Sequence, residues 1–344
     1  MATPQEIIRR IRRREFLIGV EMSPEAEEGA RNMRVNLNNA LKTLSEDLYS
    51  KDTHFVLELV QNADDNEYER GVEPEISFQL SPSRLVVQNN EVGFTESNVV
   101  ALCRVGQSTK AKRAGFIGEK GIGFKSVFTA TDRPEIHSNG FHFRFDRTDP
   151  THVLGYVVPH WCGDEGYPQG RTTIVLPAKE GTQFTGERLA ELTDELLLFL
   201  RKLQIITIAD DTAGTKRVYK RRDDSGTVTV TAEAFEPGSD VPDTVSRRRF
   251  KYVRHTYSTT NIKEDKRQDI EEAAIVLAFP ITDAGAASAD VTQNLFAFLP
   301  VRNYGLRFLV QGDFLLSSGR EDVHKNPAWN KRARDEVGSC PTRC

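Results

Sequence analysis

The chain has 344 residues, about twice the length of a usual single domain, so we expect about two domains and exclude a mini-protein. The 46 Lys and Arg residues against 50 Asp and Glu give a formal net charge of −4, which excludes a polycation that wraps nucleic acid through its overall charge. Hydrophobic residues make up 38% of the chain, and this share excludes a disordered protein.

The cysteines and the apolar runs indicate the compartment. Cys103, Cys162, Cys340 and Cys344 are too few and too scattered for a disulfide framework. No stretch approaches the roughly 18 consecutive apolar residues of a membrane span, and no cleavable apolar segment follows the basic N-terminus. We therefore expect an intracellular protein, cytoplasmic or nuclear, without a membrane partner.

Residues 1–29 are predicted to carry a basic amphipathic helix. Isoleucines and Phe16 recur at near-helical spacing over residues 6–18, and arginines fill most of the positions between them. This pattern favours a helix docked on the next domain with a solvated basic face. A nuclear-localisation signal and membrane-surface binding are the two alternatives.

Residues 30–210 alternate between helical and strand patterns and are predicted to form one domain. Thr95 followed by Asn98 offers an N-cap before an apolar run, and Ser81-Pro82-Ser83 separates two alternating runs as in a hairpin. We expect helices at 32–49, 53–68, 95–105 and 186–203, a helix-compatible run at 126–132, a hairpin of 75–80 with 84–89, and strands at 134–146, 152–158, 171–177 and 204–209.

A run of turn residues at 210–214 marks the predicted domain boundary. Residues 211–335 are richer in strands, and 336–344 read as an irregular tail. The strands expected in this second domain are 217–222, 227–235, 247–258, 273–280, 295–300 and 306–312.

Three polar residues share one face of the helix expected at 53–68. Glu58, Asn62 and Asp65 are spaced i, i+4 and i+7, so all three project to the same side. Burial of two acids and an amide together needs a reason, which points to a site. Taken alone, the segment could equally be a solvated face that ends in an Asx-rich turn.

A glycine-rich segment follows at 117–126. Gly118, Gly121 and Gly123 let backbone N–H groups turn toward one centre just before a helix-compatible run, an arrangement that suits polyphosphate. The P-loop pattern fails because Phe124 stands before the Lys-Ser pair, and the dinucleotide fingerprint fails at Ser126. A protein kinase would need H-R-D and D-F-G motifs, which the chain lacks.

Four ordered motifs fit a split nucleotide site instead: ELVQNADD at 58–65, NNEVGF at 89–94, GEKGIGF at 118–124 and RTTIVL at 171–176. Together they resemble the GHKL ATPases, the superfamily of DNA gyrase B, the large heat-shock chaperones, histidine kinases and MutL. Within it, residues 5–335 are most similar to the NO VEIN and sacsin branch. The resemblance implies an α+β chain: a Bergerat-fold α/β sandwich, with a mixed sheet and helices on one face, then a strand-rich α/β coupling domain.

The resemblance also implies roles. Glu58 would orient or deprotonate the attacking water, Asn62 would hold Mg²⁺, Asp65 would lie behind the nucleotide, and Thr172 would bond toward adenine through water. Residues 106–117 would form a lid, with Lys110 or Lys112 available to the phosphates. The remaining nucleotide-binding positions would be Asn89, Gly93, Phe94, Gly118, Lys120, Gly121, Ile122, Gly123 and Phe124.

One departure from the superfamily pattern concerns the base. Asn89 stands where Asp usually accepts from the adenine amino group, and Glu91 replaces the first glycine of D-x-G-x-G. The Asn89 amide has both an acceptor and a donor, so it would still read adenine. We treat the NNE sequence as a feature of the branch.

Arginines dominate the interpretation of the second domain. Arg320 would complete the site as a basic residue from the adjoining domain, and its alternative is a surface pair with Glu321 or Asp322. The stripes Arg217–Arg222 and Arg247–Arg254 interleave with aromatics and would contact nucleic acid, or else form solvated strand faces. We interpret His54, His137, His142 and His160 as structural because they lack ligand spacing, and Trp161 and Trp329 as core or interface anchors.

These observations predict a Mg²⁺-dependent ATP-binding protein, with slow ATP hydrolysis coupled to lid closure and chaperone-like or remodelling activity. One alternative is a nucleotide-regulated scaffold without hydrolysis, and a second is a nucleic-acid remodeller. The expected partners are ATP, a protein client and a second copy of the nucleotide domain. Because chains of the resembled branch generally continue further, we expect 344 residues to be a short or truncated form.

Overall fold

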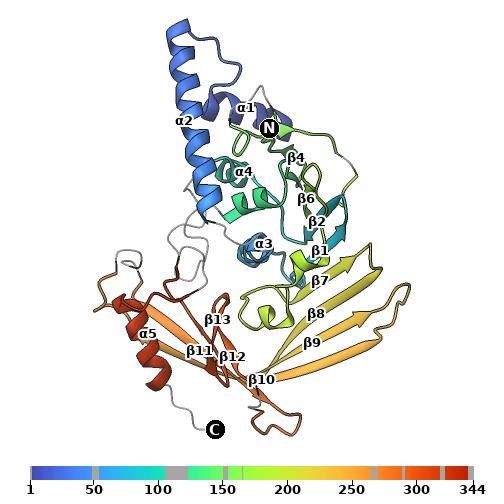
Figure 1. The fold of residues 1–344 in the computed structure, drawn as a ribbon, viewed down its shortest axis with the longest axis vertical. Helices are drawn as coiled ribbons and strands as arrows, with labels where there is room; N and C mark the ends of the chain where they lie inside the picture. The colour runs from blue at the N-terminus through green and yellow to red at the C-terminus, as the bar shows by residue number, and fades with distance from the viewer. Residues whose placement is uncertain are drawn as a thin grey trace. The chain divides into compact units, whose positions relative to one another are not determined.

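A computed structural model of the protein describes residues 2–48, 54–104, 123–149, 154–164, 166–264, 267, 270–288, 291–317 and 322–339 (Figure 1). The fold is α+β, with few helices and a large mixed sheet. The described residues form two compact units. The first gathers residues 2–104, 123–192 and 207–216, and the second gathers 193–206 and the residues from 217 onward.

The N-terminal helix of the first unit is docked, as the isoleucine pattern predicts. Helix α1 (Pro4–Phe16) begins with a capping box in which the Thr3 hydroxyl accepts from the Glu6 N–H and the Glu6 carboxylate accepts from the Thr3 N–H. Its buried face carries Ile8, Ile11 and Phe16. The helix contacts α4 (Glu96–Cys103), β4 (Phe141–Arg144) and β5 (His160–Trp161), beside the long helix α2 (Pro24–Leu48) (Figure 1).

The hairpin and the helix after it are confirmed. Strands β1 (Glu75–Ser81) and β2 (Arg84–Asn89) pair antiparallel around a short turn, and Thr95 with Asn98 forms the capping box of α4. Strand β6 (Thr172–Pro177) pairs with the other edge of β2. The order of hydrogen-bonded strands in this unit is β7 (Ile205–Asp210), β1, β2, β6, β3 (Glu135–Ser138), β4, β5.

Two expectations for residues 134–158 need correction. The strand expected over 134–146 is a hairpin, because Asn139 and Gly140 adopt φ of 49° and 77° in a two-residue turn between β3 and β4. The described part of the strand expected at 152–158 is a turn in which the Leu154 carbonyl accepts from the N–H groups of Val157 and Val158. This turn requires a glycine at position 155, because a Cβ there would lie 2.2 Å from the Asp146 carbonyl oxygen.

The expected helix at 186–203 is wrong, and tertiary contacts explain why. Two short 3₁₀ helices, η2 (Gly186–Leu189) and η3 (Asp194–Leu198), replace it. The Arg221 guanidinium donates to the carbonyls of Leu197, Leu198 and Leu200, and the Tyr252 hydroxyl also donates to that of Leu198. Because these side chains supply the donors that a longer helix would provide, the apolar run 196–200 can be buried without helical periodicity.

The second unit is built mainly of strands, as the sequence predicts. Their order is β13, β12, β14, β11, β10, β9, β8, with a parallel pair between β12 and β14, and α5 (Ala328–Ser339) contacts β11. No helix in the described part of the chain is long and apolar enough to cross a bilayer. The strands are β8 (Thr215–Asp224), β9 (Thr227–Phe235), β10 (Thr244–Ser258), β11 (Glu272–Ile281), β12 (Gln293–Ala297), β13 (Leu299–Leu306) and β14 (Leu309–Gly312).

Candidate nucleotide site

Helix α3 (His54–Asp65) carries the polar face that the sequence singles out. Glu58 and Asp65 are buried, at 7% and 5% exposure, while the Asn62 side chain between them is half-buried. The surrounding apolar residues Phe55, Val56, Leu59 and Val60 are also buried, which holds the helix rigidly in the unit. The solvated-face alternative therefore fails for Glu58 and Asp65, because both acids lie inside the protein.

The Glu58 carboxylate faces the described end of the glycine-rich segment. A Cβ built on Gly123 would lie 2.5 Å from Glu58 Oε2, so the carboxylate rests against the backbone of that residue. Gly123 begins the 3₁₀ helix η1 (Gly123–Thr129), which packs along α3. The helix-compatible run at 126–132 is thus the 3₁₀ helix η1 up to Thr129. A glycine at 123 leaves room for an acid that any larger residue would displace.

A second polar group gathers where β2 and β3 end and β6 begins. Asn89 and Thr172 are direct neighbours in the register of β2 and β6. The Thr172 hydroxyl donates to Glu91 Oε1 at 2.6 Å and lies 2.6 Å from the Ser138 hydroxyl. Asn89, Glu91, Ser138 and Thr172 are all buried, so the structure brings together the residues that the sequence assigns to the base and adds Ser138 to them.

The loop 89–94 is held in place from both sides. The Asn90 side chain accepts from the Glu75 N–H and donates to the Glu73 carbonyl. Phe94 donates its N–H to the Ser138 hydroxyl and accepts from the Asn139 amide. At Gly93, φ is +90° and a Cβ would lie 2.8 Å from that of Asn139, which explains the glycine there.

Lys125 is a buried cation near the end of the glycine-rich segment 117–126. Its ammonium donates to the carbonyls of Leu102 at 2.6 Å and Tyr156 at 2.7 Å and lies 4.2 Å from the centre of the Phe145 ring. Burial lowers the pKa of Lys125 to about 7 and raises the pKa of the nearby Cys103 thiol to about 12. Lys125 thereby joins the end of α4 to the start of η1 and to the turn at 154–157.

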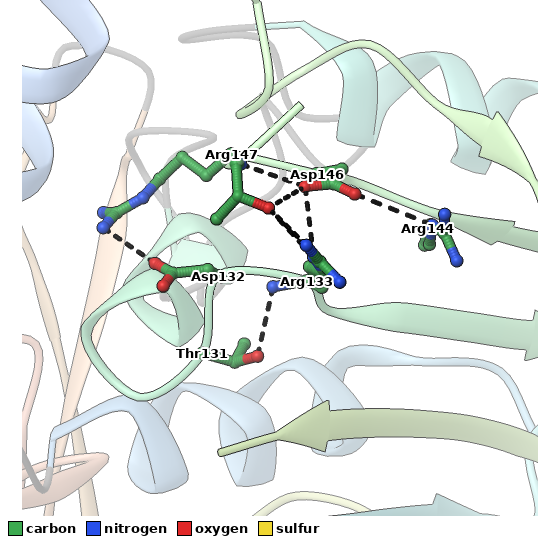
Figure 2. Close-up of polar contacts among 7 residues, drawn as sticks. Thr131, Asp132, Arg133, Arg144, Asp146 and Arg147 are labelled. Atoms are coloured by element: carbon green, nitrogen blue, oxygen red, sulfur yellow. Dashed lines mark hydrogen bonds and ion pairs between the residues drawn. The ribbon is translucent and has the colours of Figure 1, made fainter. Parts of the chain in front are cut away.

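An ion-pair cluster anchors the chain after η1 (Figure 2). Arg147 pairs with Asp132 at 2.8 Å, and Asp146 Oδ1 accepts from both the N–H and the hydroxyl of Thr148. Arg133 donates to the Thr148 hydroxyl and lies 3.4 Å from Asp146. The cluster ties the segment between η1 and β3 to the segment after β4, so it fixes both ends of the β3–β4 hairpin.

The residues fit a magnesium ion that enters with a phosphate ligand. Among the described residues, no three His, Cys, Asp or Glu side chains converge closely enough to hold a metal ion. Mg²⁺ usually needs no such cage, because one or two protein oxygens together with substrate phosphates and waters complete its shell. Asn62, one turn after Glu58 on α3, carries an amide oxygen of this kind on a half-buried side chain.

Some predicted residues lie outside the described part of the chain. They are the proposed lid at 106–117 with Lys110 and Lys112, the loop residues Gly118, Lys120, Gly121 and Ile122, and Arg320 with its possible partner Glu321. The described part of the site therefore consists of α3, the loop 89–94, Gly123 with Phe124, the end of β3 and the start of β6.

The arginines of the two stripes in the second unit fall into two groups: some pair within the protein, and others lie on the opposite face of β10. Their aromatic residues Tyr219 and Phe250 are buried, so these rings are not presented to bases. Arg248 pairs with Asp194 at 2.5 Å and with Glu195 at 2.9 Å, and Arg221 donates to the carbonyls of the last two residues of η3. The cations left on the other face of β10 are Arg247, Arg249 and Lys251, opposite Thr231, Thr229 and Thr227 of β9.

His137, His142 and Trp329 are buried in the structure, in agreement with a structural role. Nδ1 of His137 lies 3.0 Å from Nδ1 of His142 across the β3–β4 pair, under the ring of Tyr167. Trp329 is buried in the core of the second unit and donates to the Asp313 carbonyl.

Sequence reasoning missed Ser138 and Lys125. Ser138 has no sequence signal, because only the pairing of β3 with β6 brings it to Thr172. In the sequence, Lys125 belongs only to the Lys-Ser pair that mismatches the P-loop pattern. An apolar run containing a single lysine is the signal that could have found it, since a lysine in such a setting is usually bonded when buried.

Comparisons with known proteins agree with the branch that the motifs resemble. Residues 34–154 match the model of the Sacsin domain. The chain is 37% identical to "Protein NO VEIN" of Arabidopsis thaliana over 354 aligned positions, which cover 94% of this chain and 12% of that protein. It is 32% identical over 107 residues to the "Putative type II restriction enzyme HgiDII" of Herpetosiphon aurantiacus, covering 29% of this chain and 17% of that protein. The chain thus spans less than a fifth of either relative, and the match of its Sacsin domain and its identity to NO VEIN support a place beside the sacsin and NO VEIN branch.

Proposed function

We propose that the first unit is a Mg²⁺-dependent ATP-binding module of the GHKL type with a Bergerat fold, and that it hydrolyses ATP slowly. The observation that carries the proposal is the contact between the Glu58 carboxylate and the backbone of Gly123. It joins a buried acid to a segment whose glycines suit a phosphate chain. The similarity to the sacsin and NO VEIN branch adds support.

In this proposal each described residue has a defined task. The bound Mg²⁺ would supply positive charge against the phosphates and would be held by the Asn62 amide oxygen. Glu58 would hold the attacking water and accept its proton, a step that contributes about 10²–10⁴-fold to the rate. The buried Asp65 would lie behind the nucleotide, and Gly93 and Phe94 would border it. A lid over the nucleotide, Arg320 as a γ-phosphate contact, a protein client and a homodimer through this unit stay predictions.

Phosphate release measures the proposed turnover. We expect Glu58→Gln to bind ATP with Mg²⁺ as the wild type does and to release phosphate about 10²-fold more slowly or worse. Glu69→Gln, the same exchange at an exposed position after α3, is the matched control and should leave the rate unchanged. Equal rates of phosphate release in the wild type and Glu58→Gln would contradict the ATPase hypothesis and favour a nucleotide-regulated scaffold without hydrolysis.

Binding measures the rest of the proposal. Calorimetric titration of ATP should show an affinity that Mg²⁺ increases, and Asn62→Ala should remove that increase. A wild-type protein with no affinity for ATP in the presence of Mg²⁺ would overturn both the ATPase and the scaffold.

A second candidate function is contact of the second unit with nucleic acid. It rests on the row Arg247, Arg249 and Lys251, whose alternate positions on β10 face the same side with threonines beside them. Such a row would bind phosphates rather than bases.

The salt dependence of binding to a DNA duplex tests this candidate. Reversal of Arg247 and Lys251 to Glu should reduce the slope of log affinity against log salt by about one for each lost phosphate contact. Arg254→Glu, an exposed position of opposite parity on β10, is the control. An unchanged slope in the double variant would remove the candidate.

A further inference from the structure

The hydrogen bonds around Thr172 run in one direction, toward Glu91. Thr172 uses its only hydroxyl proton to donate to Glu91 Oε1. The Ser138 hydroxyl accepts from the Phe94 N–H, and its own proton is therefore free to be donated to Thr172 Oγ1. The chain Ser138 to Thr172 to Glu91 thus ends on a carboxylate, and aligned hydrogen bonds of this kind strengthen one another.

Glu91 is buried at 7% exposure at the position where the superfamily pattern has a glycine. A buried carboxylate is costly unless donors surround it, so its presence at a motif position calls for a function. The Tyr68 phenol is affected by this carboxylate. Burial raises the pKa of Tyr68, and the nearby carboxylates of Glu91 and Asp64 raise that pKa further. The Glu91 carboxylate thus lies close enough to the Tyr68 phenol to affect it and accepts a hydrogen bond from Thr172 of β6.

The loop around Glu91 is fixed on each side. Val92 donates its N–H to the Glu67 carbonyl at 2.9 Å, and the Asn90 side chain bridges Glu73 and Glu75. The Asn89 amide oxygen is turned back toward the Glu91 N–H, 3.4 Å away. The carboxylate therefore occupies the end of the polar row, while Asn89 is directed toward its own loop.

We propose that Glu91, and not Asn89, is the specificity-determining residue for the base: its carboxylate accepts from the 6-amino group of adenine. This inference rests on the proposed nucleotide binding. An ionised carboxylate is an acceptor only, so it attracts an amino group and repels the carbonyl oxygen of a 6-oxo purine. A side-chain amide, in contrast, has both an acceptor and a donor, so by rotating it can bond either the 6-amino group or the 6-oxo group. The negative charge of Glu91 thus replaces the Asp that the pattern lacks at position 89.

Competition between ATP and inosine triphosphate, which differ at the 6 position of the purine, tests the proposal. The wild type should bind ATP at least about tenfold more tightly than inosine triphosphate, since a hydrogen bond to a charged group is lost and a repulsion is gained. In Glu91→Gln the ratio should fall toward one, because the amide would donate to the 6-oxo group. Glu69→Gln, an exposed position, should keep the wild-type ratio.

Asn89→Ala provides the reciprocal variant. If Glu91→Gln does not fold, as judged by thermal unfolding, a wild-type ratio retained in Asn89→Ala supports the assignment to Glu91. A ratio lost in Asn89→Ala, or retained in folded Glu91→Gln, or a wild type that binds both nucleotides equally, overturns it. A wild type that binds neither nucleotide defeats the proposed function as well, so the two failures are distinguishable.

Discussion

The Glu58 carboxylate rests against the α-carbon of Gly123, so closely that a Cβ at position 123 would come within 2.5 Å of Glu58 Oε2. The atom in the way is the far end of a flexible side chain and not backbone. A substitution at 123 would therefore move the carboxylate rather than unfold the protein.

Gly123→Ala is accordingly expected to separate stability from activity. The free energy of unfolding should change by less than about 1 kcal/mol, because Glu58 can rotate away. If the proposed function holds, phosphate release should fall about as far as in Glu58→Gln, since the acid leaves its position. Thermal unfolding and phosphate release are the two measurements.

Gly29→Ala is the matched control for this exchange. It lies in α2 with nothing within 4 Å of the added Cβ, so it should raise stability by about 0.5–1 kcal/mol and leave phosphate release alone. A large loss of stability in Gly123→Ala would contradict the picture of a soft contact.

Lys125→Met is expected to destabilise the protein by about 2–4 kcal/mol. The exchange keeps most of the side-chain volume but leaves the carbonyls of Leu102 and Tyr156 without this donor. Denaturant unfolding at pH 7 measures the loss. A change below about 0.5 kcal/mol would show that the ammonium is dispensable to the fold.

Lys125 also predicts a pH dependence. Its pKa is lowered from 10.5 to about 7, so between these values the unfolded chain binds a proton that the native protein has lost. Stability therefore rises with pH through this window and is lowest below pH 7. From pH 7 to 9 the wild type should gain at least about 1 kcal/mol more than Lys125→Met. Parallel pH profiles for the two proteins would rule out the lowered pKa.

The buried histidine pair predicts a pH dependence on the acidic side. Burial, and secondarily His137, lowers the pKa of His142 from its ordinary value of 6.5, against the opposing effect of Asp164. As the pH falls, the unfolded chain therefore binds this proton before the native protein does. The contribution of His142 to stability is thus fully present above about pH 6.5 and is lost as the pH falls below it.

His142→Phe keeps a ring at this position and removes the titration. The groups that face the pair are Glu135, Asp164 and Tyr167, with the Trp161 ring against His142. The loss of unfolding free energy between pH 7 and 5 should be smaller in the variant than in the wild type. An equal loss in both proteins would assign the acid sensitivity to other groups.

Asn330 is expected to hold helix α5 onto the second unit. Its amide accepts from the Leu315 N–H and donates to the Leu315 carbonyl in a buried setting, and it also donates to the carbonyl of His324, which is partly buried. Asn330→Ala leaves these groups unsatisfied and should cost about 2–4 kcal/mol. Arg334→Ala, on an exposed part of the same helix, should change thermal stability by less than about 0.5 kcal/mol. Equal shifts in both variants would contradict the role of Asn330.

The sequence by itself determined the elements whose signals are local. The apolar spacing specifies α1, the Thr95 cap specifies α4, and the Ser81-Pro82-Ser83 turn specifies the β1–β2 hairpin, because each rests on contacts between residues a few positions apart. The same logic placed Glu58, Asn62 and Asp65 on one side of α3.

Tertiary structure alone decided the rest. The segment 186–203 reads as a helix, yet Arg221 and Tyr252, from strands later in the chain, satisfy its carbonyls and leave only short 3₁₀ turns. Likewise, Ser138 meets Thr172, and Glu58 meets Gly123, only because pairing and packing join distant segments. A sequence pattern records periodicity and turn chemistry, but donors and acceptors that satisfy one another across the fold leave no such pattern, and they are what assembles this site.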